Sequence, residues 1–147
     1  MNIAHKTISL QTKGKLDITD ITDNVRDWAL ESGIKEGIIN IQTLHTTATV
    51  FVNENEPELL KDFQSHLEKI ASEKENYCHN NFEVRTANVG EDECRNGHSH
   101  CQALHLPTNV CLNIINGRLQ LGQWQSILFV ELDHARKRQI QMQIVGE

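Results

Sequence analysis

Apolar and polar residues follow a strand-like pattern over most of the chain. They alternate over residues 5–11, and β-branched residues dominate residues 37–53, which divide into two stretches at His45. The C-terminal third has the same character, with a hairpin turn predicted at Asn116-Gly117 because this dipeptide favours tight turns. The strands expected there span residues 110–115, 118–121, 124–132 and 139–145.

Two segments have the periodicity of amphipathic helices. Apolar residues recur at helical spacing over residues 21–29, with Thr19 or Asp20 as the expected N-cap and Gly33 as the stop. A second helix is expected to begin at Pro57. The N–H groups in the first turn of a helix have no partner within the helix, so a proline there loses no hydrogen bond. Its apolar stripe comprises Leu59, Leu60, Phe63, Leu67 and Ile70.

The helices interrupt antiparallel-looking strands instead of alternating with them, which predicts an α+β fold with a mostly antiparallel sheet and two main helices. Residues 74–97 are polar and irregular, so a long loop is expected there, and loops of this length are often functional. A short helical piece is expected from His98 to His105, ended by Pro107. No repeat or linker is visible, so residues 1–147 are expected to form a single domain.

The charge balance excludes a general nucleic-acid binder. With 14 basic and 20 acidic side chains the net charge is −6, whereas neutralising phosphates requires a basic face. The one basic cluster, residues 136–138, is interpreted as a solvated turn, which would also suit a small phosphorylated ligand. No apolar run approaches the roughly 20 residues of a membrane span. The first residues lack the features of a signal peptide, so a cytoplasmic protein with reduced cysteines is expected.

The eight histidines are the main chemical signal. Imidazole is the commonest metal ligand and also serves as an acid or base near neutral pH. The densest cluster, residues 94–101 followed by His105, is too crowded for one structural zinc site, which usually has two separated ligand pairs. An open metal site built from two or three histidines of different segments is the preferred interpretation. The alternative is that they are ordinary polar residues, which is our interpretation of His5, His66 and His134.

A second group of polar residues surrounds the start of the Pro57 helix. Asn53 and Glu54 end a strand, and Asp62 follows one helical turn or so into the helix. Loops at such junctions often build sites, although Asn55 or Glu56 also suits a helix cap. By apolar context alone, Trp124 and Cys111 are expected to pack in the core.

Taken together, these motifs resemble the YjbQ-like family, also called the secondary thiamine-phosphate synthase family. The resemblance runs over nearly the whole chain. It rests on His45-Thr46-Thr47-Ala48, Asn53-Glu54-Asn55, Asp62, Tyr77, His79, Asn96-Gly97-His98-Ser99-His100, Gly117-Arg118-Leu119, Gly122, Trp124-Gln125, Glu131 and Gly146-Glu147. Pro107, Asn113 and Gln123 depart from the family pattern, which affects the expected loop geometry and substrate choice.

The resemblance implies a homotrimer with a histidine-rich site near a subunit boundary, holding a divalent metal such as zinc. It also implies weak thiamine-phosphate synthase activity, a transfer that joins a pyrimidine pyrophosphate to a thiazole phosphate. Carried over residue by residue, the implied metal ligands are His45, His79 and His100, with His98 as the alternative to His100. Glu54 and Asp62 are implied as catalytic acids, and Asn53, Arg118 and Gln125 as substrate contacts.

Three functions follow from these residues. The first is a metal-assisted enzyme on a small phosphorylated metabolite, in which three histidines leave a coordination position open. The second is a non-catalytic binding protein for a metal or small ligand. The third is a histidine cluster that only hydrogen-bonds at a subunit interface. The sequence leaves open which of the three applies, and what the physiological substrate is.

Overall fold

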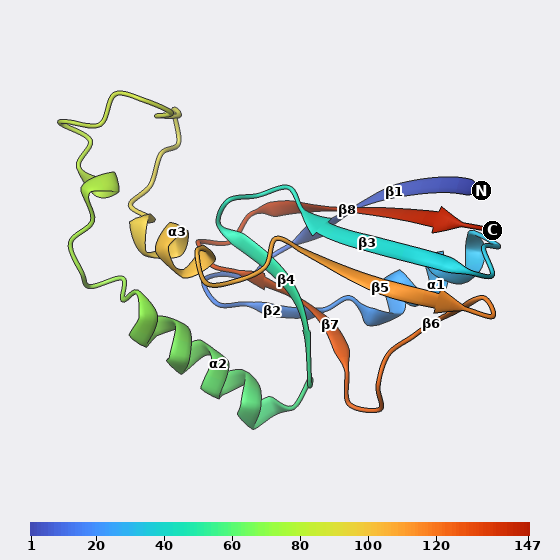
Figure 1. The fold of residues 1–147 in the computed structure, drawn as a ribbon. Coiled ribbons are helices and arrows are strands. Elements are labelled where there is room, and N and C mark those ends of the chain that lie inside the picture. The colour runs from blue at the N-terminus through green and yellow to red at the C-terminus, as the bar shows by residue number, and fades with distance from the viewer.

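The computed structural model describes residues 1–147 and arranges the strands in two antiparallel sheets (Figure 1). The larger sheet has the order β1-β8-β3-β5-β6, and the smaller has the order β2-β7-β4. The elements are β1 (Asn2–Gln11), β2 (Ile18–Asp20), α1 (Thr22–Glu31), β3 (Gly37–Thr43), β4 (Ala48–Asn53), α2 (Pro57–Ile70), the 3-10 turn η1 (Cys78–Asn80), α3 (Gly97–Ala103), β5 (Asn109–Ile115), β6 (Arg118–Leu119), β7 (Ser126–Glu131) and β8 (Lys137–Gly146). The expected α+β class with mostly antiparallel strands is confirmed.

The main core lies between the two sheets and α1. Alternate side chains of β8, such as Ile140 and Met142, point inward and meet Val50 of β4 and Phe129 of β7. The apolar face of α1 completes this core with Val25 and other residues. The same strand β7 is buried on both faces, which explains why its sequence is continuously apolar instead of alternating.

A smaller core fixes α2 on the other face of the small sheet. Leu67 of α2 packs with Val130 and Leu132, and the rings of Phe51 and Phe63 meet edge to face with centroids 5.9 Å apart. The carboxylate of Glu56 accepts hydrogen bonds from the first-turn N–H groups of α2, so Glu56 is the cap. Figure 1 shows α2 leading into the irregular segment before α3, at the end of the molecule away from the two termini.

The larger sheet leaves one face without a covering helix (Figure 1). In β8 the side chains alternate between buried and exposed, so the glutamines point away from the core. Because paired positions share a face, the strand register extends this surface across β1, β3 and β5. We call it the open face: Ile3, His5, Thr7, Ser9, Gln11, Ile38, Asn40, Gln42, Asn109, Cys111, Asn113, Ile115, Lys137, Gln139, Gln141, Gln143 and Val145. Lys137, the first residue of β8, is the one charged residue among them.

Three side-chain environments differ from those that the sequence predicts. Trp124 is 67% exposed in the connection between β6 and β7, and Cys111 is exposed on the open face. Both were expected in the core because their neighbours are apolar, but a turn and an outward register position place them in solvent. Arg138 was expected in a solvated turn, yet β8 already begins at Lys137 and directs Arg138 inward, where it is 2% exposed.

The helices are three, since the short segment expected near His98 forms α3. Helix α1 begins later than predicted because the residues of its expected cap form β2, while Gly33 follows its end with a positive φ of 71°. Asp20 still binds the N–H of Thr22, at 2.8 Å. None of these helices combines the length with the apolar character needed to cross a bilayer.

Candidate functional site

A polar cavity of about 560 Å³ lies where α3, η1 and the β3–β4 connection meet. Its wall brings together segments that are far apart in sequence. The lining residues are Leu44, His45, Thr46, Thr47, His79, Arg85, Ala87, Asn88, Glu93, Asn96, His100, Arg136 and Arg138. We call this space the histidine cavity, because all three histidines that the family resemblance proposes as metal ligands line it.

His45 is positioned by the connection between β3 and β4. Its backbone N–H donates to Thr43 Oγ1 at 3.3 Å, and its Nε2 accepts the backbone N–H of Gln139 at 2.8 Å. Burial and the positive charge of Arg138 lower the pKa of His45, so the neutral ring is favoured. The nitrogen with the lone pair is already used by Gln139, so His45 joins a metal only by giving up that hydrogen bond.

His79 and His100 pack against each other on the opposite wall. Their ring centroids are 4.6 Å apart, with η1 carrying His79 and α3 carrying His100. Burial and the neighbouring His79 lower the pKa of His100. The Nε2 atom of His79 is buried and has no hydrogen-bond partner. An unpartnered buried nitrogen is costly, so this atom fits a ligand that would satisfy it.

The structure separates the two histidines of the Asn-Gly-His-Ser-His segment. His98 is 3% exposed, and one of its nitrogens lies 3.1 Å from Ser99 Oγ. It lines a different cavity, together with Cys94 and Asp133, whereas His100 lines the histidine cavity. Residues two positions apart on a helix point to different sides, so α3 directs His100 toward His79 and His98 away from it.

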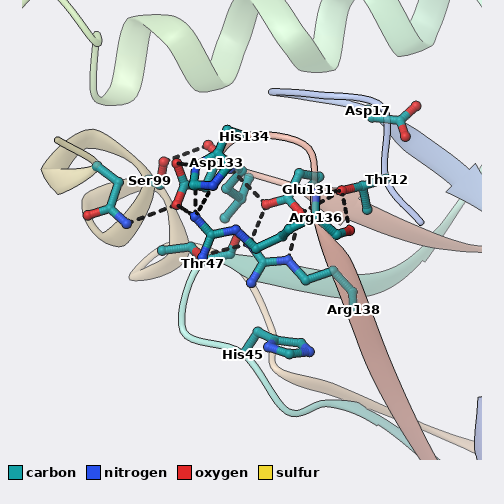
Figure 2. Close-up of polar contacts among 12 residues, drawn as sticks. Thr12, Asp17, His45, Thr47, Ser99, Glu131, Asp133, His134, Arg136 and Arg138 are labelled. Carbon is teal, nitrogen blue, oxygen red and sulfur yellow. Dashed lines mark hydrogen bonds and ion pairs between the residues drawn. The ribbon is translucent and has the colours of Figure 1, made fainter. Parts of the chain in front are cut away.

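Two arginine–carboxylate pairs form one side of the histidine cavity. Arg138 makes a bidentate ion pair with the fully buried Glu131 and donates to Thr47 Oγ1 at 2.9 Å. Arg136 pairs with Asp133 at 2.8 Å. Figure 2 shows the two arginine side chains lying alongside each other, with His45 close to Arg138. These pairs fix guanidinium groups at the cavity wall.

A third arginine closes the cavity from the irregular segment. Arg85 pairs with Glu93 at 2.9 Å and also donates to the backbone oxygen of Asn88 at 2.6 Å. The cavity therefore contains three guanidinium groups and only one lining carboxylate, that of Glu93. Asn96 Oδ1 and Arg136 Nε are buried there without partners. The arrangement suits an anionic ligand together with a cation held by histidines.

The structure does not bring the other proposed residues into this cavity. Asn53 lies at the far end of β4 from His45, and a strand of this length spans about 16 Å at 3.3 Å per residue. Glu54 and Asp62 are exposed beyond it, outside the lining of the histidine cavity. Arg118 lines a separate small cavity with Arg26, and Gln125 accepts the N–H of Gly122 within its own turn, at 2.8 Å.

Sequence reasoning missed several residues of the cavity. Arg85, Glu93 and Asn96 lie in or beside a segment that has no periodicity to interpret. Arg136 was considered as a contact for a phosphorylated ligand, and the structure places it on the cavity wall. Arg138 was assigned to solvent. The only available signal was Glu131, a charged residue within an apolar run. A charge buried there needs a partner of opposite charge, which Arg138 provides.

One group of three potential ligands is compact in this structure, and it is not the histidine set. Cys94, Asp133 and His134 offer ligand atoms that all lie within 4.8 Å of one another. The three cavity histidines share a space without converging to that degree. The fit of a metal to the histidine cavity therefore rests on the donor types and on the unpartnered His79 nitrogen.

Comparisons with known proteins cover the whole chain. The family model described as UPF0047 protein YjbQ-like matches residues 6–147. A UPF0047 protein of Methanothermobacter thermautotrophicus is 35% identical over 147 residues, covering 100% of this chain and 95% of that protein. The UPF0047 protein YugU of Bacillus subtilis is 30% identical over 142 residues, covering 96% of this chain and 98% of that protein.

Solved structures show the same fold. A YbjQ-like protein of unknown function from Sulfolobus solfataricus P2 aligns with a TM-score of 0.87 and 30% identity, covering 99% of each chain. A hypothetical protein from Aeropyrum pernix K1 aligns with a TM-score of 0.86 and 30% identity, covering 98% of this chain and 99% of that one. The similarity thus concerns the complete domain, from β1 to β8.

Proposed function

The chain belongs to the UPF0047 YjbQ-like family, and from this premise we propose that its histidine cavity holds a divalent metal ion beside a small phosphorylated metabolite. The observation that supports this proposal most directly is the lining of one cavity by three histidines and three arginines. Imidazole suits zinc and related divalent ions, and guanidinium suits phosphate. Each of these arginines is already ion-paired with a carboxylate, so the metal ion would supply the net positive charge that an anion needs in this acidic chain.

The proposed metal ligands are His45, His79 and His100. Three histidines leave one coordination position for water or substrate, and a bound zinc ion neutralises phosphate charge or activates water. The lowered pKa values of His45 and His100 favour the neutral rings that metal binding requires. The buried Nε2 atom of His79 has no protein partner and supports its assignment.

The arginines supply the anion-binding part of the proposal. The ion pairs of Arg85, Arg136 and Arg138 hold the guanidinium groups at the cavity wall before ligand arrives. Such preorganised groups bind phosphate without a large ordering cost. Arg118 is not among these contacts within one chain, because it lies beside Arg26 near α1.

We also propose a homotrimer in which a neighbouring copy completes the site. Asn53, Glu54 and Gln125 lie at the opposite end of the small sheet from the histidine cavity. In a ring assembled head to tail, the far end of one copy meets the cavity end of the next. Within a ring of this kind, Glu54 and Asp62 of one copy would supply carboxylates that the neighbouring cavity lacks.

The function that we favour is a metal-assisted transfer of the thiamine-phosphate synthase type, with other phosphorylated metabolites as physiological substrates. In this reaction a pyrimidine pyrophosphate and a thiazole phosphate are joined and pyrophosphate leaves. The alternative is a non-catalytic metal or ligand binder. One observation favours that alternative: the single carboxylate lining the cavity, Glu93, is already paired with Arg85.

Metal content tests the proposal. The wild type and the variants His100→Ala and His66→Ala are purified without a histidine tag. The number of metal ions bound per chain is then measured for each by native mass spectrometry. His66 is exposed on α2 and serves as the matched control. We expect His100→Ala to lose about one ion per chain, because each histidine of a three-ligand site is needed, and His66→Ala to lose none. An unchanged metal count in His100→Ala would overturn the ligand assignment.

The variant Glu54→Gln separates the enzyme from the binder. We expect it to keep the metal and the native mass while the rate of pyrophosphate release falls by roughly 100-fold or more, the range that general acid–base catalysis contributes. Loss of mass without a specific effect on rate would assign Glu54 to assembly. No pyrophosphate release from the metal-loaded wild type would favour the binding protein.

A further inference from the structure

Cys94, Asp133 and His134 form a second cluster outside the histidine cavity. None of the three lines that cavity, and all three line another of about 340 Å³. Cys94 precedes α3, while Asp133 and His134 follow β7, so the fold joins residues that are 39 and 40 positions apart. A thiol, a carboxylate and an imidazole together are a common ligand set for zinc-like ions.

The spacing of the ligand atoms matches a tetrahedral ion. With zinc–sulfur distances near 2.3 Å and zinc–nitrogen or zinc–oxygen distances near 2.0–2.1 Å, neighbouring ligand atoms lie roughly 3.3–3.6 Å apart. Cys94 Sγ lies 3.5 Å from His134 Nδ1, 3.8 Å from Asp133 Oδ1 and 3.6 Å from Asp133 Oδ2. His134 Nδ1 lies 3.1 Å from Asp133 Oδ1, so the three atoms Sγ, Nδ1 and Oδ1 are within about 0.3 Å of tetrahedral spacing. Small side-chain rotations would bring all three to coordination distances.

A positive group already stands among the three ligands. Arg136 Nη2 lies 2.8 Å from Asp133 Oδ2, 2.7 Å from His134 Nδ1 and 3.7 Å from Cys94 Sγ. The same nitrogen also lies 2.7 Å from His134 Nε2, so it faces the imidazole ring and does not lie along the lone pair of either ring nitrogen. Asp133 Oδ2 is the group that presents negative charge to it, as it would to a metal ion. The guanidinium nitrogen therefore occupies a position suited to a cation.

The cluster also has the support that metal sites require. The side chain of Asp133 is 6% exposed and is oriented by Asn96 Nδ2 at 2.9 Å. Burial alone would raise the pKa of Asp133, but hydrogen bonds from Asn96 and His134 and the charge of Arg136 lower it, so the carboxylate is ionised. Burial and that carboxylate raise the pKa of Cys94, so the thiol holds its proton until a metal displaces it to solvent.

We propose that Cys94, Asp133 and His134 bind a divalent ion of the zinc class, in place of the Arg136 guanidinium. Three protein ligands leave the fourth position to water in the adjoining cavity. Of the two lysines that line this cavity, Lys13 and Lys15, Lys15 is ion-paired with Glu68 and Glu73 at 2.8 and 2.9 Å. Arg136 also lines the histidine cavity, so its displaced guanidinium has polar surroundings to move into.

Cobalt titration of the reduced full-length protein tests this site. Cobalt(II) takes zinc positions and gives a thiolate-to-metal charge-transfer band when a cysteine is bound. We expect the band in the wild type. In Cys94→Ser we expect the band to vanish and the cobalt affinity of this site to fall more than about 100-fold. Losing a residue that only hydrogen-bonds to a metal ligand already lowers metal affinity about 10–100-fold, and Cys94 is itself a proposed ligand. Cys101→Ser is the matched control, because Cys101 is also partly buried, and it should keep the band.

Two further variants make the result specific. His134→Asn should weaken cobalt binding as strongly as Cys94→Ser, and Arg136→Gln should tighten it several-fold because the competing cation is gone. His100→Ala should lose its own ion and keep the thiolate band, so failure of one site is distinguishable from failure of the other. A wild type without the band in excess cobalt, or a band that survives in Cys94→Ser, would overturn the proposal.

Discussion

Arg136 and Arg138 illustrate how position decides the role of a residue. Arg136 directly precedes β8 and Arg138 is the second residue of β8, and Figure 2 shows their side chains lying alongside each other. Arg138 lies deeper, with a side chain 3% exposed against 34% for Arg136. The deeper arginine has a buried partner, Glu131, and is fixed by it. The shallower one lines the histidine cavity and is ion-paired with Asp133, which lies outside that lining.

The buried Glu131–Arg138 pair predicts a large stability effect. Arg138→Met should lower the free energy of unfolding by roughly 3–5 kcal/mol, because it leaves the carboxylate of Glu131 buried and uncompensated. The double variant Glu131→Leu/Arg138→Met should recover much of this loss, since it removes both charges. Urea unfolding at fixed protein concentration measures both.

The exposed pair of Arg26 and Asp23 provides the control for that measurement. Its side chains are 49% and 86% exposed, so Arg26→Met should cost less than about 1 kcal/mol. If Arg138→Met costs no more than Arg26→Met, the buried pair does not carry the stability that its burial implies.

At the scale of elements, the contact between α3 and η1 sets the distance between His79 and His100. Gly97 begins α3, and its N–H donates to Asn80 Oδ1 at 2.9 Å. A Cβ atom at Gly97 would lie 2.5 Å from Cβ of Tyr77, so only glycine allows this approach. The close packing of two short elements thus brings together histidines from both of them.

This contact predicts the effect of a single methyl group. Gly97→Ala should lower the free energy of unfolding by roughly 1–3 kcal/mol, the usual cost of overpacking, and should separate η1 from α3. Thermal unfolding measures the stability, and the His100-dependent metal content measures the separation. Gly90→Ala is the control from the same irregular segment, because an added Cβ there meets only one atom, at 3.9 Å. Equal stability of the two variants would contradict this account.

At the scale of the whole molecule, the open face is the surface best suited to contact a partner. The chain is 23% charged, yet this face across four strands carries one charged side chain, Lys137, among amides, hydroxyls, aliphatic side chains, one histidine and one thiol. Two of its apolar members, Ile3 and Ile38, are 63% and 47% exposed. The centre of a subunit interface is typically depleted of charge. In the proposed trimer, this face and the end of the small sheet that carries Glu54 would both contact neighbouring copies of the chain.

The open face predicts a way to dissociate the assembly. Asn40→Glu combined with Gln141→Glu should convert the proposed trimer into monomers, because the two carboxylates would be desolvated without partners in the contact. Native mass spectrometry and sedimentation measure the change. Ser65→Glu on the exposed side of α2 is the control and should stay trimeric. A wild type that is monomeric, or a double variant that keeps its mass, would contradict the assignment of this face.

Much of the fold followed from the sequence because it depends on local patterning. The 3.6-residue periodicity around Val25 and Leu67, the cap at Glu56 and the turn at Asn116-Gly117 each act within a few residues. For the same reason α3 and the strands other than β2 lie close to their predicted positions, whereas the residues of β2 were expected to lead into the first helix. Trp124 was misplaced because apolar character does not reveal on which side of a turn a residue lies.

The site depended on contacts between distant segments. The family resemblance singled out His45, His79 and His100, but only the folded chain brings them to one cavity and separates His98 from His100. The same is true of Cys94 with Asp133, since their separation in sequence gives no local signal. Local interactions fix which elements form, and hence the α+β class. Which side chains meet is decided by the pairing and packing of those elements, which no short stretch of sequence determines.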